Sequence, residues 1–322
     1  MFNNNCTQDV DTAFAHDVEK GLSRQPKMLS SMYFYDRRGD ELFQAIMRMP
    51  EYYLTDSELE IFTGQKDQIL NAVGDEPFEL IELGAGDGYK TKVLLSHFLE
   101  KEVSFVYRPV DISPNVLHHL QQDLKKQWPE LLVRPLNGDY FRMLERLQSE
   151  AGHRKVILFL GANIGNYTYD EAADFLSQLC AQMGPDDLLL IGFDLKKDPA
   201  VILDAYNDRA GITAAFNLNL LERINRELGA DFVIDEFHHW ETYDPVNGAA
   251  RSYIVSKKEQ TVQVEALGRS FHFEAWEAID VELSLKYSPN ELEELAHRAG
   301  FEPLRHFYDD RRYFVDSLWR VR

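Results

Sequence analysis

The sequence has few cysteines and few basic residues for its length. Only two of its 322 residues are cysteine, too few for a disulfide framework or a zinc site built from thiolates. It has 34 Lys and Arg residues against 54 Asp and Glu residues, so the formal net charge is −20. Binding to nucleic acid or to an anionic membrane needs clustered basic side chains, and this deficit argues against both.

Long apolar runs are also missing. Val156–Leu160 and Leu188–Phe193 have the length of β-strands and are far shorter than a bilayer requires. The segment Met1–Gly21 is polar and acidic, unlike a signal peptide. Hydrophobic residues still form 44% of the chain and aromatic residues 12%, which is enough for a large core. We therefore expect a soluble, cytoplasmic, monomeric protein with no nucleic-acid or membrane partner.

The middle of the chain alternates apolar strands with amphipathic helices. The predicted strands are 78–83, 105–110, 131–136, 156–160 and 188–193. Such strands, separated by helices, are typical of a parallel sheet covered on both faces. A capping box at Ser288-Pro289-Asn290-Glu291 begins a further helix, and the last two strands, 301–307 and 313–319, follow it.

A different pattern interrupts this alternation. Residues 199–228 are predicted to form two helices, and strand-like segments follow at 232–243, 251–257, 261–267, 270–276 and 279–287. Asn247-Gly248 separates the first two of these segments and predicts a β-hairpin. The sequence therefore predicts an α/β domain made of residues 57–194 and 287–322. A second, α+β domain is expected from residues 1–56 and 195–286.

A glycine-rich loop follows the first strand of the predicted α/β domain. It reads Glu82-Leu83-Gly84-Ala85-Gly86-Asp87-Gly88, and its glycines let the backbone turn tightly and approach a ligand closely. The dinucleotide fingerprint needs its third glycine where this chain has Tyr89, so the loop does not match it. With an acidic residue two places before the first glycine, the loop resembles motif I of class I S-adenosylmethionine (SAM) methyltransferases. A cationic sulfonium donor tolerates carboxylates such as Glu82 nearby.

Two more carboxylates follow the next two predicted strands. Asp111 is placed where a doubly wound fold binds ribose hydroxyls, and Asp139 could accept the adenine amino group while Tyr140 packs on the ring. Asp111 could instead be a helix cap and Asp139 a turn residue. The loop and both acids at three successive strand ends favour a Rossmann-like SAM-binding sheet.

Several strings outside this loop are more specific. In chain order they are Tyr33–Asp36, Glu41–Phe43, Pro50–Thr55, Phe159–Asn166, Ala205–Asp208, Gly211–Asn217 and Glu282–Tyr287. In this order and spacing the chain, from about Gly21 onward, resembles the L-histidine Nα-methyltransferase family of ergothioneine biosynthesis. The resemblance implies SAM-dependent methylation of the α-amine of free histidine to the trimethyl betaine hercynine. It also implies that the N-terminal segment and the central insertion form the substrate-binding domain.

The resemblance further implies roles for individual residues. The implied SAM contacts are Tyr35, Phe43, Gly84, Gly86, Lys90, Asp111, Asp139 and Tyr140. The implied substrate contacts are Tyr52, Gly161, Asn166, Tyr206, Ser252, Glu282 and Ser284. Among them Tyr52, Asn166 and Tyr206 would hold the substrate carboxylate and amine, and these are the predicted catalytic residues. Glu282 and Ser284 would read the imidazole.

These residue types suit the chemistry. Methyl transfer to a neutral amine needs no strong acid or base, so positioning should dominate catalysis. Phenol and amide groups can bond a carboxylate without adding a cation that would repel the sulfonium. A carboxylate such as Glu282 can accept a strong hydrogen bond from an imidazole N–H group.

Each residue taken alone also has a simpler interpretation. Aromatic residues usually lie in the core, Lys90 could be solvated, Asn166 could be a turn residue, and Glu282 and Ser284 could line an exposed strand face. Adjacent strand residues face opposite ways, so His238-His239 does not predict a metal site.

One position departs from the expected family pattern. The resemblance predicts methionine beside the imidazole, where this chain has Ser252, and a small polar residue there could enlarge the pocket. A thiolated histidine or tryptophan is therefore an alternative acceptor. An NAD-dependent oxidoreductase and a non-catalytic SAM-binding module are alternative functions.

Overall fold

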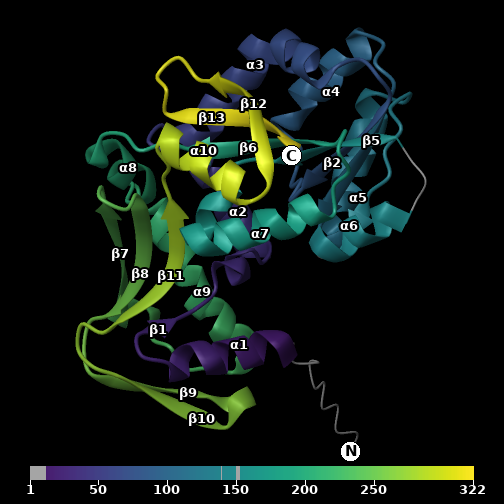
Figure 1. Cartoon of the computed structure of the whole chain (residues 1–322). Coiled ribbons are helices and arrows are strands. Elements are labelled where there is room, and N and C mark those ends of the chain that lie inside the picture. Colours follow the sequence, from purple (N-terminus) through teal and green to yellow (C-terminus); the bar gives the residue numbers. More distant parts are fainter. Residues whose placement is uncertain (1–11, 139, 150–152) are drawn as a thin grey trace, which may run out of the picture. The chain divides into compact units, whose positions relative to one another are not determined.

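The chain divides into two compact units. The structure is a computed structural model and describes residues 12–138, 140–149 and 153–322 (Figure 1). Unit 1 comprises Met1–Tyr53 and Asp198–Ser284, and unit 2 comprises Leu54–Lys197 and Leu285–Arg322. These boundaries differ by a few residues from those expected from the sequence, which followed residues 56, 194 and 286.

Unit 2 is built on a seven-stranded sheet with the order β12-β13-β6-β5-β2-β3-β4. The strands are β2 (Phe78–Leu83), β3 (Phe105–Asp111), β4 (Leu136–Asn137), β5 (Arg154–Phe159), β6 (Leu188–Asp194), β12 (Phe301–Tyr308) and β13 (Phe314–Val321). The five strands from β6 to β4 are parallel, and β13 runs antiparallel to both of its neighbours. The sequence-based prediction of an α/β fold with a mainly parallel sheet is confirmed.

Helices cover this sheet on both faces (Figure 1). They are α3 (Tyr53–Val73), α4 (Thr91–Glu100), α5 (Pro114–Gln127), α6 (Tyr140–Ser149), α7 (Tyr169–Ala181) and α10 (Pro289–Arg298). Every residue of β2 and β6 is buried, including the acids Glu79, Glu82 and Asp194, as expected of parallel strands covered on both faces. The predicted strand 131–136 is wrong in length, because Pro135 has no N–H group for a sheet ladder and only an isolated bridge at Val133 precedes β4.

Unit 1 contains a four-stranded sheet of order β1-β11-β8-β7 and a separate two-stranded sheet. Its strands are β1 (Lys27–Met28), β7 (Phe237–Asp244), β8 (Ala249–Ser256), β9 (Gln260–Val264), β10 (Arg269–Phe273) and β11 (Ala278–Leu285). Its helices are α1 (Thr12–Ser23), α2 (Arg37–Ile46), α8 (Pro199–Tyr206) and α9 (Ile212–Leu228). As the Asn247-Gly248 turn predicts, β7 and β8 form an antiparallel hairpin in which Asp244 pairs with Ala249.

The core of unit 1 lies between α9 and the strands. Phe216 and Ile224 of α9, Phe237 of β7 and Ile254 of β8 belong to one buried cluster. Helix α9 is bounded at both ends by glycines in the left-handed conformation, Gly211 and Gly229. Asp208 accepts hydrogen bonds from the first amides of this helix, those of residues 212 and 213, at 2.9 and 2.8 Å.

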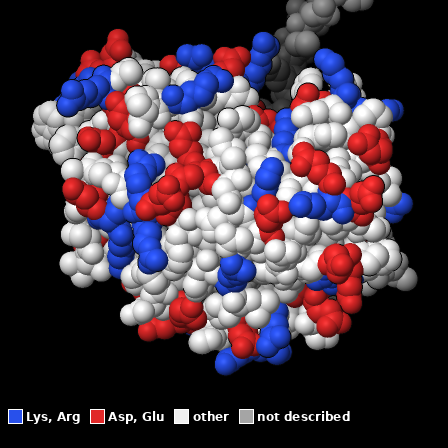
Figure 2. Space-filling view, turned by 90° about the horizontal axis from the view of Figure 1, so that it is seen from above, with Lys and Arg blue, Asp and Glu red and all other residues white. Residues whose placement is uncertain are grey.

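Charged side chains of both signs share the surface. Figure 2 shows Lys and Arg interspersed with Asp and Glu on one face of the molecule. Exposed pairs such as Arg320–Glu302, at 2.8 Å, each contribute little to stability because water screens them. Among the described residues, no helix is long and apolar enough to cross a membrane.

A buried ion triad closes the carboxyl end of β6. Asp194 pairs with Lys197 and, at 2.8 Å, with Lys286, and all three side chains are at most 4% exposed. Burial raises the pKa of Asp194, but the two lysines outweigh it and hold this pKa below its usual value. Burial lowers the pKa of Lys197 to about 8. The Tyr287 amide donates to the Asp194 carbonyl at 3.0 Å, so the triad ties the end of β6 to the segment before α10.

We expect Asp194→Ala to destabilise unit 2 strongly, because it leaves two buried ammonium groups without their shared carboxylate. The expected loss is about 3 kcal/mol or more, which lowers the Tm by roughly 6 °C or more in calorimetry. Asp186→Ala, on the exposed turn before β6, is the matched control and should change little. Equal Tm values for the two variants would contradict this role of the triad.

Candidate active site

The glycine loop after β2 brings together four of the residues predicted to bind SAM. Gly84 and Gly86 have positive φ values of 75° and 53°. A Cβ atom on Gly84 would lie 2.8 Å from the Tyr140 hydroxyl oxygen, so glycine is required where Tyr140 packs on the loop. The Gly86 amide donates to an Asp111 carboxylate oxygen at 3.3 Å. These residues meet at the carboxyl ends of β2 and β3, beside the point where the strand order reverses.

Asp111 makes further contacts, and one of the other predicted SAM residues lies outside the described part of the chain. Asp111 is not the helix cap that the sequence left open, because Ser113 caps α5 by accepting from the Val116 amide at 3.3 Å. Asp111 instead accepts from the Ser113 amide at 2.9 Å as well as from Gly86. Asp139 lies outside the described residues.

A second strained loop follows β5. Gly161 and Ala162 both adopt the left-handed conformation, with φ of 74° and 57°, and for a non-glycine residue this costs about 1 kcal/mol or more. The Gly161 amide donates to Glu58 of α3 at 2.8 Å. Glu58 also forms an ion pair with Lys90, whose ammonium nitrogen lies 3.5 Å from the place a Gly161 Cβ would take. Lys90 is therefore fixed against this loop rather than freely solvated.

Asn166 ends the short 3₁₀ helix Asn163–Asn166 that follows this loop, and its side chain is exposed. The loop is held closely, because a Cβ atom on Gly165 would lie 2.8 Å from the Leu285 carbonyl oxygen.

Glu82 has a different role from the one its sequence position suggested. It is 4% exposed, and both of its carboxylate oxygens accept hydrogen bonds, from the Thr91 hydroxyl at 2.5 Å and from the Tyr107 hydroxyl. Burial raises the pKa of Glu82 to about 7, although the two hydrogen bonds oppose this shift. Glu82 thus ties β2 to β3 and to the start of α4, and it supports the glycine loop instead of facing a ligand.

In unit 1 several of the predicted substrate residues converge. The Tyr206 hydroxyl, at the end of α8, hydrogen-bonds with the Ser284 hydroxyl of β11 at 2.9 Å. The Tyr52 ring meets the Tyr206 ring edge-on, with centroids 6.2 Å apart. Tyr206 is 7% exposed and Ser284 8%, so this pair is buried rather than part of a solvated strand face.

Ser252 adds a polar group next to Glu282. Its hydroxyl donates to Glu241 of β7 at 2.7 Å and lies 3.4 Å from a Glu282 carboxylate oxygen. The sequence analysis did not identify Glu241, although the hairpin turn predicts which residues of the two strands lie opposite each other. Counting outward from the pair Asp244–Ala249 places Glu241 directly opposite Ser252.

Tyr35 and Phe43, the other two predicted SAM contacts, belong to unit 1. Their rings meet edge-on at 5.5 Å, and both rings also pack against Phe216 of α9. Tyr35 remains 45% exposed, so its ring offers a surface beyond the core of unit 1.

The two adjacent histidines have structural surroundings. The His239 ring nitrogen Nε2 lies 2.9 Å from the Tyr206 carbonyl oxygen, and burial lowers the pKa of His239, which favours a neutral ring that donates this bond. His238 stacks on Trp240 with centroids 6.3 Å apart. Within the described ranges, no three His, Cys, Asp or Glu side chains are grouped to hold a metal ion.

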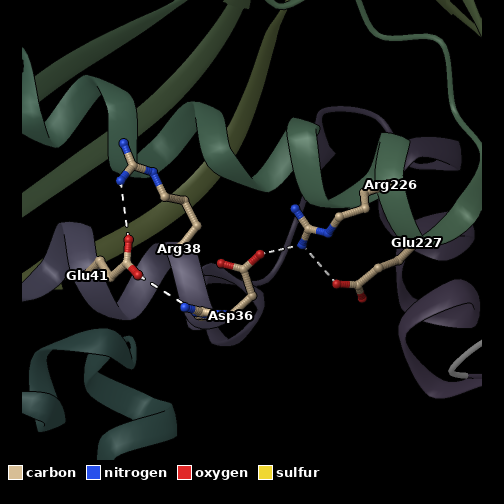
Figure 3. A pocket seen from close by; sticks show the side chains of 6 residues that line it. Asp36, Arg38, Glu41, Arg226 and Glu227 are labelled. Atoms are coloured by element: carbon tan, nitrogen blue, oxygen red, sulfur yellow. Dashed lines mark hydrogen bonds and ion pairs between the residues drawn. The ribbon is translucent and has the colours of Figure 1, made fainter.

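A surface hollow of about 480 Å³ lies elsewhere in unit 1 (Figure 3). It is lined by Asp36, Arg37, Arg38, Glu41, Arg226 and Glu227. Figure 3 shows these charges facing one another: Arg226 contacts Asp36 and Glu227, and Arg38 contacts Glu41. Asp36 also caps α2 through the Gly39 amide at 2.7 Å. The hollow therefore joins α2 to α9 by ion pairs and contains none of the predicted site residues.

Comparison with known proteins fits this geometry. Residues 14–321 match the family described as histidine-specific, SAM-dependent methyltransferases. The chain belongs to this family. The resemblance stated from the sequence is confirmed.

Named relatives match most of the chain. The histidine N-alpha-methyltransferase of Mycolicibacterium smegmatis is 36% identical over 307 residues, covering 95% of this chain and 94% of that protein. Ergothioneine biosynthesis protein 1 of Schizosaccharomyces pombe is 32% identical over 293 residues, covering 88% of this chain and 37% of that protein. The 4-dimethylallyltryptophan N-methyltransferase of Aspergillus fumigatus is 24% identical and covers 91% of this chain and 89% of that protein.

The raised pKa of Glu82 predicts a pH-dependent stability. Between its ordinary pKa of 4.5 and about 7, the folded protein holds a proton that the unfolded chain releases. The contribution of this group to the free energy of unfolding therefore falls as pH rises across this window. Glu82→Gln cannot titrate, so we expect its Tm to rise relative to the wild type as pH increases through the window.

The measurement is calorimetry of both proteins over this pH range. Glu100→Gln, an exposed change at the end of α4, is the control and should give a difference that does not vary with pH. A constant difference for Glu82→Gln as well would show that Glu82 has no raised pKa.

Proposed function

We propose that this protein transfers methyl groups from SAM to the α-amine of L-histidine and forms the trimethyl betaine. Membership in the histidine-specific family and the 36% identity to a histidine N-alpha-methyltransferase support this function. The observation that carries it is a set of polar side chains in unit 1: the buried Tyr206–Ser284 pair, and buried Ser252 beside the half-buried carboxylate of Glu282. Such a group offers both donors and an anionic acceptor to an imidazole ring.

Unit 2 is proposed to hold the methyl donor. Three glycines with positive φ open the backbone after β2, and the Asp111 carboxylate lies at the end of β3, where a ribose fits. SAM would supply an electrophilic methyl group on a sulfonium. We assign Gly84, Gly86, Asp111 and Tyr140 to its binding, together with Lys90 and with Asp139, Tyr35 and Phe43 as the resemblance implies.

Unit 1 is proposed to bind the side chain of the acceptor. Glu282 would accept a hydrogen bond from one imidazole nitrogen, and Ser284, already bonded to Tyr206, would contact the other. Tyr52, Tyr206 and Asn166 keep the role of orienting the amine and carboxylate, and Gly161 keeps the substrate contact that the resemblance implies. Because these groups are uncharged, they bind the carboxylate without opposing the positive charge that moves from sulfur to nitrogen.

Ser252 bears on the choice of acceptor. The sequence left a larger aromatic substrate open, because serine is smaller than methionine. In the structure the hydroxyl bonds Glu241 and lies near Glu282, so this position is polar and acidic. An indole has one N–H group and a large apolar ring, whereas an imidazole has two polar ring nitrogens, one donor and one acceptor when it is neutral and two donors when it is protonated. We therefore favour histidine over tryptophan and keep thiolated histidine as the second candidate. A monomeric, cytoplasmic protein stays a prediction from the sequence.

The direct test is a product analysis. We expect purified protein, incubated with SAM and each free amino acid, to give mono-, di- and trimethylated histidine by mass spectrometry, with little product from tryptophan. Product from thiolated histidine alone would replace the acceptor and keep the reaction. SAM binding with no methylated product from any amino acid would favour a non-catalytic module, and stabilisation by NAD but not by SAM would favour an oxidoreductase.

Glu282→Ala is expected to lower kcat/KM for histidine by about 100-fold or more, because the imidazole N–H loses a charged acceptor. The dissociation constant for SAM should stay near the wild-type value. Glu259→Ala is a matched change, since Glu259 is an exposed acid of unit 1, and it should leave both quantities unchanged. Unchanged histidine kinetics in Glu282→Ala would remove Glu282 from the site.

A further inference from the structure

Three carboxyl groups and a single ammonium group are gathered in the interior of unit 2. Glu58 and Asp316 are 0% exposed and Glu82 is 4% exposed, and the charge of Lys90 acts on all three of these acids. A buried carboxylate is strongly disfavoured unless a cation or hydrogen-bond donors face it. Lys90 can neutralise only one of these acids, so each of the other two must either accept hydrogen bonds from donors or carry a proton.

Glu82 is satisfied by the two hydroxyl groups described above, and Glu58 by Lys90 and the Gly161 amide. Asp316 has neither kind of partner. Among the described residues, both of its carboxyl oxygens are buried without a hydrogen-bond donor, and its carboxyl group interacts with that of Glu58. Two carboxyl groups can form a hydrogen bond only when one of them carries the proton.

The backbone around this pair makes room for the contact. Asp316 of β13 pairs across the sheet with Gly192 of β6. A Cβ atom at Gly192 would lie 2.6 Å from a Glu58 carboxylate oxygen, so any side chain there would displace Glu58. The neighbour of Asp316 on β12 is Phe307, which is uncharged. The charged groups that act on Asp316 are therefore Glu58 and Lys90, and its burial and Glu58 raise its pKa.

We propose that Glu58 and Asp316 share one proton and act as a single positioning unit, which fixes the Lys90 ammonium and the Gly161 amide for SAM binding. Asp316 carries the proton and donates a hydrogen bond to the Glu58 carboxylate, which pairs with Lys90. Glu58 contacts Lys90 and the Gly161 amide, and Asp316 acts through Glu58, so both are positioning residues and not catalytic ones.

Protonation of Asp316 lowers the negative charge near the SAM site. With Asp316 protonated, the charges of Glu58 and Lys90 cancel, so this pair is neutral where it meets a ligand that carries both cations and a carboxylate. An ammonium has three N–H groups, and Lys90 remains 20% exposed, so it can bond Glu58 and still meet the carboxylate of SAM. Ionisation of Asp316 would add a second negative charge and draw Lys90 toward the acids, away from this anionic group.

This inference rests on the proposed function, specifically on SAM binding beside Lys90. In the wild type the shared proton is lost as pH rises through the raised pKa of Asp316, so SAM affinity should fall toward alkaline pH. Asp316→Asn keeps a donor for Glu58 but cannot ionise. We expect it to bind SAM as the wild type does at neutral pH and to lack the alkaline loss.

Glu58→Gln keeps an acceptor for the Gly161 amide but removes the negative charge opposite Lys90. We expect it to raise the dissociation constant and the KM for SAM on the order of tenfold, with little change in KM for histidine. In a Lys90→Met background the same Glu58→Gln change should have a much smaller effect, because Glu58 acts through Lys90.

The experiment is calorimetric titration of SAM into each protein from neutral to alkaline pH, with histidine kinetics and Tm recorded in parallel. Glu79→Gln is the matched control, because Glu79 is also a buried carboxylate of unit 2 and pairs with Arg108 at 2.8 Å. It should lower the Tm without changing SAM affinity. If Glu58→Gln behaves like Glu79→Gln, or Asp316→Asn retains the alkaline loss, the pair is only structural and the inference is wrong. If the wild type itself binds no SAM, the proposed function fails instead.

Discussion

The burial of carboxyl groups in unit 2 is the constraint on which its architecture depends. Each such group must meet a cation, a set of donors or a proton, and the fold uses all three. Glu79 faces Arg108, and Asp194 faces two lysines. Glu82 accepts from two hydroxyl groups. These contacts join neighbouring strands and helix starts, so the neutralisation of buried charge also fixes the sheet edge at which the loops emerge.

The loops at that edge can therefore hold unfavourable conformations. Gly84 and Gly86 turn in the left-handed region, and Ala162 does so without the freedom of glycine. Such backbone strain persists only where the surroundings determine it strongly. Glu82 below the first loop and Glu58 beside the second supply those surroundings. Preorganised loops suit a reaction whose rate depends mainly on the orientation of two ligands, as methyl transfer to an amine does.

In unit 1, the register of the strands determines which polar side chains lie next to one another. Three neighbouring strands, β7, β8 and β11, bring Glu241, Ser252 and Glu282 side by side, although they lie far apart along the chain. The hairpin turn sets the first of these pairings and the sheet order sets the second. A net charge of −20 argued against polyanionic partners. The structure adds that some of these acids are buried inside both units.

The sequence by itself determined the elements whose signals are local. Apolar runs predicted the parallel strands, Asn247-Gly248 predicted the hairpin, and the glycine spacing distinguished a SAM loop from a dinucleotide loop. Only the tertiary structure decided the partners of the buried acids. Nothing local connects Glu58 of a helix with Asp316 of the last strand, and the motif alone placed Glu82 beside the ligand. Local patterns determine on which strand or helix each acid lies. Burial and long-range pairing depend on how the strands assemble, so the tertiary structure determines the protonation and the role of each acid.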